Sequence, residues 1–341
     1  MLLCGRGCSN LFLRPSEDDL DQCPLLSCKT LRIRHVTDCF SSHQRMFFLS
    51  KFVKPMLPEV IIPTLIDKKI LGCLNIPPTV SSMITSSEVL LHVDNTLSLP
   101  LNPLYHRYCV EVKPKWLSVS PENDTSSCFF CLLHNSETHF CPLKLCNISH
   151  LDSTISDLLN HPRNNLKFFI NGNPSHSLSF TRPQQHSLLY SLFSRSQEFF
   201  QRLASLQSKL DQIGILSFRD YFANQEPSLE DLHNLMGDIG LNDWLDSESQ
   251  SEFSQLARMY SLAMTLRDLS VYFCFYYPMT TDSSNSFDFT SFDFHFHVAD
   301  TDPKCLCRVN KWLTRWDSIC DEGPCSSCVR SSSMEVNMSA V

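Results

Sequence analysis

The sequence predicts an α+β fold in which a strand-rich N-terminal part precedes a part of mixed helices and strands. Short apolar runs of strand length dominate residues 1–107, and amphipathic helical patterns alternate with apolar runs from residue 108 onward. The chain has 341 residues, of which 43% are hydrophobic and 19% are charged. It is therefore long enough to bury a sizeable core and too apolar to be generally disordered.

The N-terminal part has the pattern of a strand, a glycine turn, a second strand, a loop and a third strand. Residues 5–13 (GRGCSNLFL) hold the glycine turn between the first two strands, and residues 29–36 (KTLRIRHV) supply the third after an acidic stretch. Residues 60–66 and 88–93 are further short apolar runs. We expect one or two helices to accompany these strands.

The second part begins with a strand-like run at residues 108–112 (YCVEV). Helical spacing follows at residues 151–160 and 187–212. Another amphipathic helix, at residues 250–269, runs into the buried-strand composition of residues 271–277.

Residues 286–300 show the clearest strand pattern. Apolar Phe292, Phe294, Phe296 and Val298 alternate with polar Asp293, His295 and His297. This alternation predicts one buried face and one polar face. The Ser-rich tail, residues 321–341, is predicted to be disordered.

Charge and composition restrict the function classes. A net charge of −8 at pH 7 argues against a nucleic-acid partner but leaves room for a local basic pocket. The sequence has no sustained apolar N-terminal run and no uninterrupted apolar stretch of membrane-spanning length, so we expect neither a signal peptide nor a membrane partner. We expect a cytoplasmic or nuclear monomer whose 17 cysteines are mostly reduced.

A lysine-proline-lysine sequence ends the strand at residues 108–112. Pro114 cannot continue a sheet, and Lys113 and Lys115 would face the same side of an extended chain. Two like charges on one side repel unless an anion lies between them, so we predict phosphate binding here. The alternative is an edge strand that lysine and proline protect against aggregation.

Three further segments suit phosphate contacts. Gly5 and Gly7 allow backbone N–H groups to approach a phosphate, and Arg32 offers a planar donor fork. Residues 163–167 (RNNLK) place amide and cationic side chains before an apolar strand. The alternatives are a tight turn, a solvated strand cation and an ordinary Asn-rich turn.

Two aspartates occupy positions that a phosphoryl transfer site needs. Asp268 lies between a helix and a strand, and Asp300 ends the alternating strand. In magnesium-dependent phosphoryl transfer, one carboxylate holds the metal and another accepts the proton of the attacking hydroxyl. Lys304 and Arg308 would share a face with each other if that segment is helical. The alternative is that both aspartates are helix-end or turn residues.

Cysteine and histidine clusters give a separate metal hypothesis. The first cluster has zinc-ligand chemistry and contains Cys128, Cys131, His134, His139 and Cys141. A second candidate contains Cys320, Cys325 and Cys328. Because the chain uses cysteine freely, chance proximity is the alternative.

Taken in order, these motifs resemble the inositol-pentakisphosphate 2-kinase family from about residue 5 to about residue 316. The most specific match is Glu-Val-Lys-Pro-Lys at residues 111–115, between the glycine-rich hairpin and a late Asp-x-Asp-x-Lys. Other matching segments are GRGCSNL (5–11), TLRIR (30–34), LHVDNTL (91–97), CFFC…HFCPLKL (128–145), NNLKFFING (164–172), LQSKLDQIG (206–214), AMTLRDLSVYF (263–273) and VADTDPKCLCR (298–308). The resemblance implies a two-lobed kinase-like fold, with an N-lobe over residues 1–107 and a C-lobe over residues 108–320.

The resemblance also implies an activity, namely ATP-dependent phosphorylation of the 2-hydroxyl of inositol 1,3,4,5,6-pentakisphosphate. By this resemblance Asp268 is the catalytic aspartate, Lys113 bridges the transferring phosphate, and Asp300 is the Mg²⁺ ligand. The implied ATP-binding residues are Gly5, Gly7, Cys8, Ser9, Asn10, Arg32, Val93, Asp94, Asn95, Glu111, Val112, Lys113 and Lys167. The implied substrate-binding residues are Lys115, Asn164, Lys304, Arg308 and Trp312.

The sequence departs from the family pattern at several positions. Arg6 replaces a loop glutamate, Leu133 and Glu137 stand where the family has histidine and lysine, and Lys144 replaces an aspartate. Trp312 stands where a tyrosine is expected. These departures keep two alternatives open. One is a protein of the same fold that binds inositol phosphate or ATP with weakened catalysis, and the other is a zinc-stabilised interaction protein.

Overall fold

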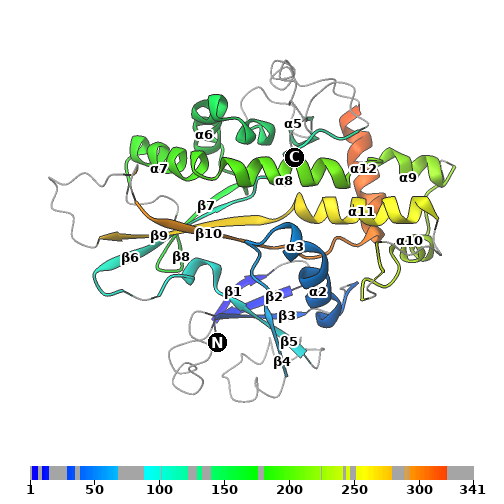
Figure 1. The fold of residues 1–341 in the computed structure, drawn as a ribbon, viewed down its shortest axis with the longest axis horizontal. Coiled ribbons are helices and arrows are strands. Elements are labelled where there is room, and N and C mark those ends of the chain that lie inside the picture. The colour runs from blue at the N-terminus through cyan, green and yellow to red at the C-terminus, as the bar shows by residue number, and fades with distance from the viewer. Residues whose placement is uncertain are drawn as a thin grey trace.

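The computed structural model has two five-stranded antiparallel sheets with helices (Figure 1), which confirms the α+β prediction. It describes residues 2–6, 10–14, 29–34, 39–67, 88–100, 102–121, 129–132, 140–175, 180–223, 225–240, 243–245, 251–278, 289 and 292–320. The predicted tail, residues 321–341, lies outside the described residues. The division into two lobes at residue 107 stays a prediction.

The first sheet is built from the N-terminal part of the chain. Its strands, in order across the sheet, are β1 (Leu2–Arg6), β2 (Asn10–Arg14), β3 (Lys29–Arg34), β5 (Glu88–Val93) and β4 (Thr64–Asp67). The predicted order of three strands is confirmed, and the register of β1 against β2 shifts between Leu3 and Gly5. The residues between β1 and β2, which the sequence predicts as a glycine turn, lie outside the described part of the chain.

A helical segment connects β3 to β4. It consists of α2 (Ser42–Phe48), η2 (Leu49–Val53) and α3 (Lys54–Met56). α2 begins with a capping box, in which Ser41 and Gln44 each satisfy a backbone N–H of the other. Helix formation in this part of the chain was predicted and is confirmed.

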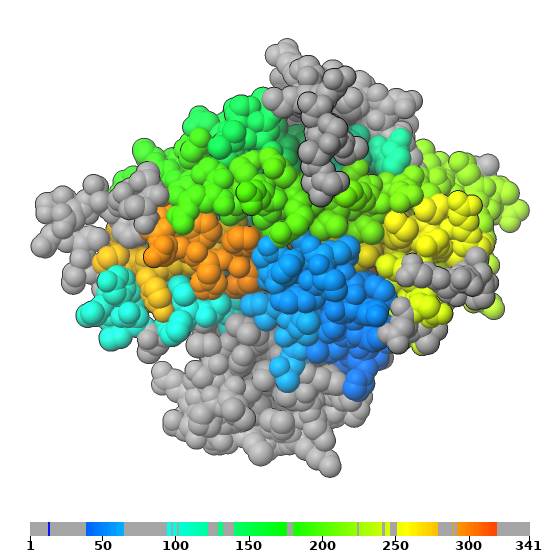
Figure 2. Space-filling view, viewed as in Figure 1, coloured from blue at the N-terminus to red at the C-terminus, as the bar shows by residue number. Residues whose placement is uncertain are grey.

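The helical segment packs against the C-terminal part of the molecule. The ring of Phe48 lies 5.8 Å from that of Trp244, and Val60 forms a β-bridge with Val298. Figure 2 shows this segment in blue, next to the green and yellow helices and the orange strand β10. Residues from both parts of the chain therefore share one hydrophobic core.

The second sheet has the order β10-β9-β6-β7-β8. The strands are β6 (Tyr105–Val112), β7 (Leu166–Ile170), β8 (Asn173–Ser175), β9 (Ser270–Pro278) and β10 (Phe294–Ala299). β6 lies at the centre and is buried from Tyr108 to Val112. The strands predicted at residues 108–112 and 271–277 are confirmed.

Helices pack on this sheet and on each other. Figure 1 shows α8 and α11 running side by side, with α12 crossing near one end of the pair. The α-helices of this part are α5 (Phe129–Leu132), α6 (Leu151–Asn160), α7 (Arg182–Ser194), α8 (Gln197–Leu210), α9 (Leu216–Tyr221), α10 (Leu229–Met236), α11 (Glu252–Leu266) and α12 (Val309–Cys320). The short 3-10 helices are η4 (Asn95–Leu97), η5 (Pro142–Cys146), η6 (Ile148–His150) and η7 (Leu306–Arg308).

The helix predictions are confirmed with one difference. The sequence did not predict α5, α9, α10 and α12. The helix expected over residues 187–212 is divided at Arg195 and Ser196 into α7 and α8. Among the described residues, none of the helices combines the length and the apolar character that a membrane crossing requires.

The alternating segment differs from its prediction in two ways. β10 begins only at Phe294, and His297, expected on a polar face, is 4% exposed. The cause is η4, which packs against the central strands of this sheet and brings Asn95 to His297. The prediction of an open polar face at His297 is therefore wrong.

Candidate functional site

The second sheet brings three charged residues to one of its edges. Val112, at the end of β6, pairs with Val271 near the start of β9, and Ala299, at the end of β10, pairs with Ser270. The residues just beyond these strand ends therefore lie near one another. They are Lys113, Asp268 and Asp300, which the sequence predicted to act together.

Lys113 and Asp300 form an ion pair at this edge. The Lys113 Nζ lies 2.5 Å from Asp300 Oδ2, and the two side chains are 10% and 44% exposed. Burial opposes the charge of Lys113, but the attraction of Asp300 and then Asp268 exceeds this effect and raises its pKa. Lys113 is therefore a fixed cation that interacts with both carboxylates.

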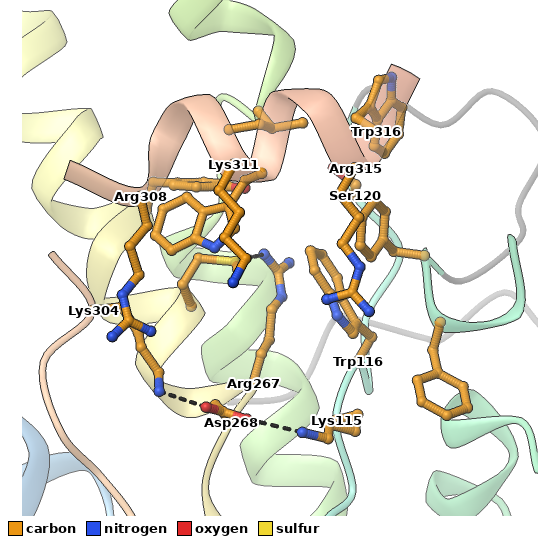
Figure 3. A pocket seen from close by; sticks show the side chains of 16 residues that line it. Lys115, Trp116, Ser120, Arg267, Asp268, Lys304, Arg308, Lys311, Arg315 and Trp316 are labelled. Atoms are coloured by element: carbon orange, nitrogen blue, oxygen red, sulfur yellow. Dashed lines mark hydrogen bonds and ion pairs between the residues drawn. The ribbon is translucent and has the colours of Figure 1, made fainter. Parts of the chain in front are cut away.

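Asp268 is held between two lysines. Its Oδ1 accepts a hydrogen bond from Lys115 at 2.8 Å and its Oδ2 accepts one from Lys304 at 2.5 Å (Figure 3). Burial favours the neutral carboxyl, but the charges of Lys304 and Lys115 outweigh it and hold the pKa of Asp268 well below its usual range. Asp268 is therefore ionised, with both oxygens engaged.

Buried amide side chains fix the backbone around the two lysines. The side-chain amide of Asn165 donates to the carbonyl of Lys113, and the backbone carbonyl of Asn165 accepts from the N–H of Lys113, both at 2.9 Å. Gln207 donates to the carbonyl of Lys115 at 2.9 Å and accepts from the N–H of Leu117 at 2.8 Å. These contacts hold Lys113 and Lys115 in place from below the surface.

Two site residues adopt left-handed backbone conformations. The φ angle is 60° at Lys115 and 59° at Asp300. This conformation costs a residue other than glycine about 1–3 kcal/mol, so the conformation persists only where the surrounding structure imposes it. The chain at Lys115 is therefore not extended, and the two lysines engage different carboxylates. Whether Lys113 and Lys115 also flank one anion stays a prediction.

A cavity of about 250 Å³ opens beside Asp268. Its lining is strongly cationic, and Asp268 is the one acidic residue among the described residues that form it. The cations that line it are Lys115, Arg267, Lys304, Arg308, Lys311 and Arg315. Aromatic side chains, among them Trp116 and Trp312, form much of the remaining wall.

One face of η7 and α12 supplies three of these cations. Arg308, Lys311 and Arg315 are spaced by three and four residues, which places them on the same side of a helix. Figure 3 shows all three extending from the helix into the space opposite Asp268. Within the described part of the chain, no carboxylate forms an ion pair with any of the three. Their charge is available to a ligand.

Most of the substrate-binding residues that the resemblance implied lie around this cavity. Lys115, Lys304, Arg308 and Trp312 line it. Asn164 does not. It is exposed in the turn before β7, whereas its neighbour Asn165 is buried and holds Lys113. Sequence reasoning missed three of the lining cations, which are Arg267, Lys311 and Arg315.

The implied nucleotide-binding residues are spread over both sheets. Glu111 accepts a hydrogen bond from Ser270 Oγ at 2.9 Å, and its other oxygen lies 3.5 Å from Lys167 Nζ across the β6–β7 pair. Asp94 is 3% exposed and caps η4, and Asn95 Oδ1 lies 2.9 Å from His297 Nε2.

The remaining implied nucleotide-binding residues lie in strands or outside the described residues. Gly5, Asn10 and Arg32 lie in β1, β2 and β3. Val93 and Val112 end β5 and β6. Gly7, Cys8 and Ser9 lie outside the described residues, so the ATP-binding assignment stays a prediction.

The two predicted zinc clusters are described only in part. Cys131 and Cys141 are buried and form no disulfide. Cys128, His134, His139, Cys325 and Cys328 lie outside the described residues, and Cys320 ends α12. Two of the departures from the family pattern, Leu133 and Glu137, also lie outside, whereas Lys144 is half-buried in η5.

A comparison with known families decides the relationship. The model of the inositol-pentakisphosphate 2-kinase family matches residues 29–317. The chain belongs to this family. The resemblance stated from the motifs is therefore confirmed, and the matched range includes Lys113, Asp268, Asp300 and α12 up to Asp317. A search of curated proteins finds no match.

Membership of the inositol-pentakisphosphate 2-kinase family gives the cavity a chemical context. A kinase family implies ATP and a divalent metal, and this family implies an inositol phosphate substrate. A ring that carries several phosphate groups needs several cations around it, because each charge-assisted contact neutralises one oxygen. The lining beside Asp268 supplies several such cations.

Proposed function

We propose that this chain transfers the γ-phosphate of ATP to the 2-hydroxyl of inositol 1,3,4,5,6-pentakisphosphate, giving inositol hexakisphosphate and ADP. The observation that carries the proposal is the position of Asp268, at the wall of a cavity lined by six cations. A polyphosphate needs the cations, and a hydroxyl that attacks a phosphate needs a nearby carboxylate.

The ion pairs of Asp268 suggest how the substrate prepares this residue. Phosphate oxygens compete with Asp268 for the ammonium groups of Lys115 and Lys304, because both are charge-assisted acceptors. When these lysines turn to the substrate, the pKa of Asp268 rises toward its ordinary value. The carboxylate is then free to accept the proton of the 2-hydroxyl.

Asp300 is the residue that we propose for holding Mg²⁺. It offers the hard oxygen donors that Mg²⁺ prefers, and its side chain is 44% exposed. When bound there, Mg²⁺ would neutralise charge on the phosphates of ATP. Lys113, which pairs with Asp300, is the residue that we propose for contacting the transferred phosphate.

A second candidate is a protein that binds inositol phosphate or ATP with little turnover. It is favoured by the double ion pairing of Asp268, since a carboxylate between two ammonium groups is a weak base. We prefer the kinase because Asp268 and Asp300 both lie beside Lys113. Two carboxylates repel a polyphosphate, so a site for binding alone has little use for them.

The test is to incubate the purified chain with Mg-ATP and inositol 1,3,4,5,6-pentakisphosphate and to separate the products by anion exchange. Inositol hexakisphosphate should form, and Asp268→Ala should abolish it. Asp152→Ala is the matched control, because Asp152 is an exposed aspartate on α6. No product, with inositol pentakisphosphate still bound in calorimetry, would support the second candidate. Failure to bind inositol phosphate and ATP would refute both.

A further inference from the structure

Cys39 meets two cysteines of a distant segment, Cys305 and Cys307, which lie between Lys304 and Arg308. Cys39 lies just before α2, and Cys305 and Cys307 lie at the start of η7 and within it. Their sulfur atoms all lie within 4.8 Å of one another, and the Sγ atoms of Cys39 and Cys307 are 3.1 Å apart. All three are free thiols.

We propose that Cys39, Cys305 and Cys307 bind a zinc ion. Thiolate sulfur is a preferred zinc ligand, and a tetrahedral site with Zn–S bonds of about 2.3 Å places its sulfurs about 3.8 Å apart. The cysteine cluster reaches this spacing with side-chain adjustments of less than about 1 Å. The fourth position is left to water or to His233, an exposed residue on α10, which packs against η7.

The backbone of η7 supports this interpretation. The N–H of Cys307 points at the sulfur of Cys305 at 3.3 Å, and N–H donors to the ligand atoms are typical of metal–thiolate sites. Burial also suits a structural metal. Cys305 is 3% exposed, Cys307 is half-buried, and Cys39 closes the cluster at the surface.

A disulfide explains the cluster less well. A bond between Cys39 and Cys307 would use two sulfurs and leave Cys305 beside them without a role. A reducing compartment, which we expect for this chain, also disfavours a disulfide. Three sulfurs that converge from two segments are what a metal site requires.

The metal would act on the candidate substrate site without touching it. Lys304 precedes Cys305, and Arg308 follows Cys307, so two cations that line the cavity flank these two ligands in the chain. Zinc would tie this segment to the chain before α2, next to the 3.1 Å ion pair between Arg45 and Asp302. The consequence for substrate binding rests on the proposed function, but the metal site itself does not.

The experiment measures the zinc content of the full chain, expressed with zinc and passed through a desalting column, by elemental mass spectrometry. Cys39→Ser and Cys307→Ser should each contain one zinc fewer per chain than the unmodified protein. A control variant should retain it. Cys146→Ser replaces a half-buried thiol outside the cluster. Circular dichroism checks that each variant is folded. Because Cys39 is exposed, we expect Cys39→Ser to fold.

A second readout uses Co²⁺ in place of zinc. The unmodified protein should show the visible absorption of tetrahedral cobalt with thiolate ligands, and Cys39→Ser should lose it. Three results would overturn the proposal. They are full zinc retention in Cys39→Ser and Cys307→Ser, a zinc-free protein with all thiols reduced, and a cross-linked Cys39–Cys307 peptide found by mass spectrometry.

Discussion

Arg267 and Asp211 form an ion pair that is almost completely buried behind the candidate substrate cavity. Their nitrogen and oxygen atoms are 2.6 Å apart, and the side chains are 1% and 0% exposed. The same guanidinium lies 3.8 Å from the ring centroid of Trp116. Arg267 lines the cavity, but its charge is already satisfied inside the protein, so its role is to support the wall next to Asp268.

Replacing Arg267 with Met should therefore destabilise the fold. The change leaves the carboxylate of Asp211 buried without its partner, which costs about 3–5 kcal/mol. Urea denaturation of the variant should show this decrease in the free energy of unfolding. The double variant Arg267→Met, Asp211→Leu should recover much of the loss, and an equal loss in both variants would contradict this account.

Removal of Lys311 or Arg315 should weaken substrate binding and leave ATP binding unchanged. Each supplies a charge-assisted contact, and at an exposed position we expect its loss to raise the KM for inositol pentakisphosphate by about tenfold. Lys311→Ala and Arg315→Ala should be compared with Lys209→Ala, an exposed lysine on α8. If only the KM for ATP changed, Lys311 and Arg315 would belong to the nucleotide site and this prediction would be contradicted.

Asp300→Asn should lower turnover and raise the Mg²⁺ concentration needed for half-maximal rate. The amide keeps the size of the side chain but removes its charge, so it weakens the metal site and releases Lys113. Steady-state rates across a Mg²⁺ titration measure both effects, with Asp268→Asn for comparison. Asp268→Asn should lose about 10²–10⁴-fold in turnover with an unchanged Mg²⁺ requirement. Identical Mg²⁺ curves for Asp300→Asn and the unmodified protein would exclude the metal role.

The stability of the fold should fall in mild acid because of His297. Burial, together with the neighbouring His295, lowers the pKa of His297 to about 4 from an ordinary value of 6.5. The folded state thus favours the neutral ring. Its contribution is fully present above pH 6.5 and is lost as the pH falls toward 4, by up to about 3 kcal/mol.

His297→Gln removes this titration and tests the prediction. The slope of unfolding free energy against pH should flatten between pH 6.5 and 4 in this variant. His295→Gln is the control, because His295 is exposed and should account for a smaller part of the slope. An unchanged slope in His297→Gln would show that other groups govern the acid response.

Much of the sheet structure could be predicted from local patterns. The apolar runs that became β3, β5, β6 and β9 were recognisable within a few residues of their ends. The burial of His297 could not be predicted in this way. It depends on η4, which folds over the strand from about 200 residues earlier in the chain.

Some residues of the candidate site could be predicted from the sequence and others could not. Asp268 meets Lys115 from 153 residues away and Lys304 from 36 residues away, so only the family resemblance could group them beforehand. Lys311 and Arg315 were missed because α12 was not predicted. Their spacing from Arg308 marks one helix face, but such cations look like ordinary solvated charges until the helix is placed opposite Asp268.

The left-handed backbone at Lys115 and Asp300 has a consequence for any attempt to engineer this protein. At both positions glycine would suit the backbone better than the residue present. A redesign guided by stability alone would therefore favour glycine at the two places where the ammonium and the carboxylate are needed. The redesigned protein would then tolerate higher temperatures but lack the two charged side chains. A stability measurement alone would not reveal that loss, and only an activity assay would.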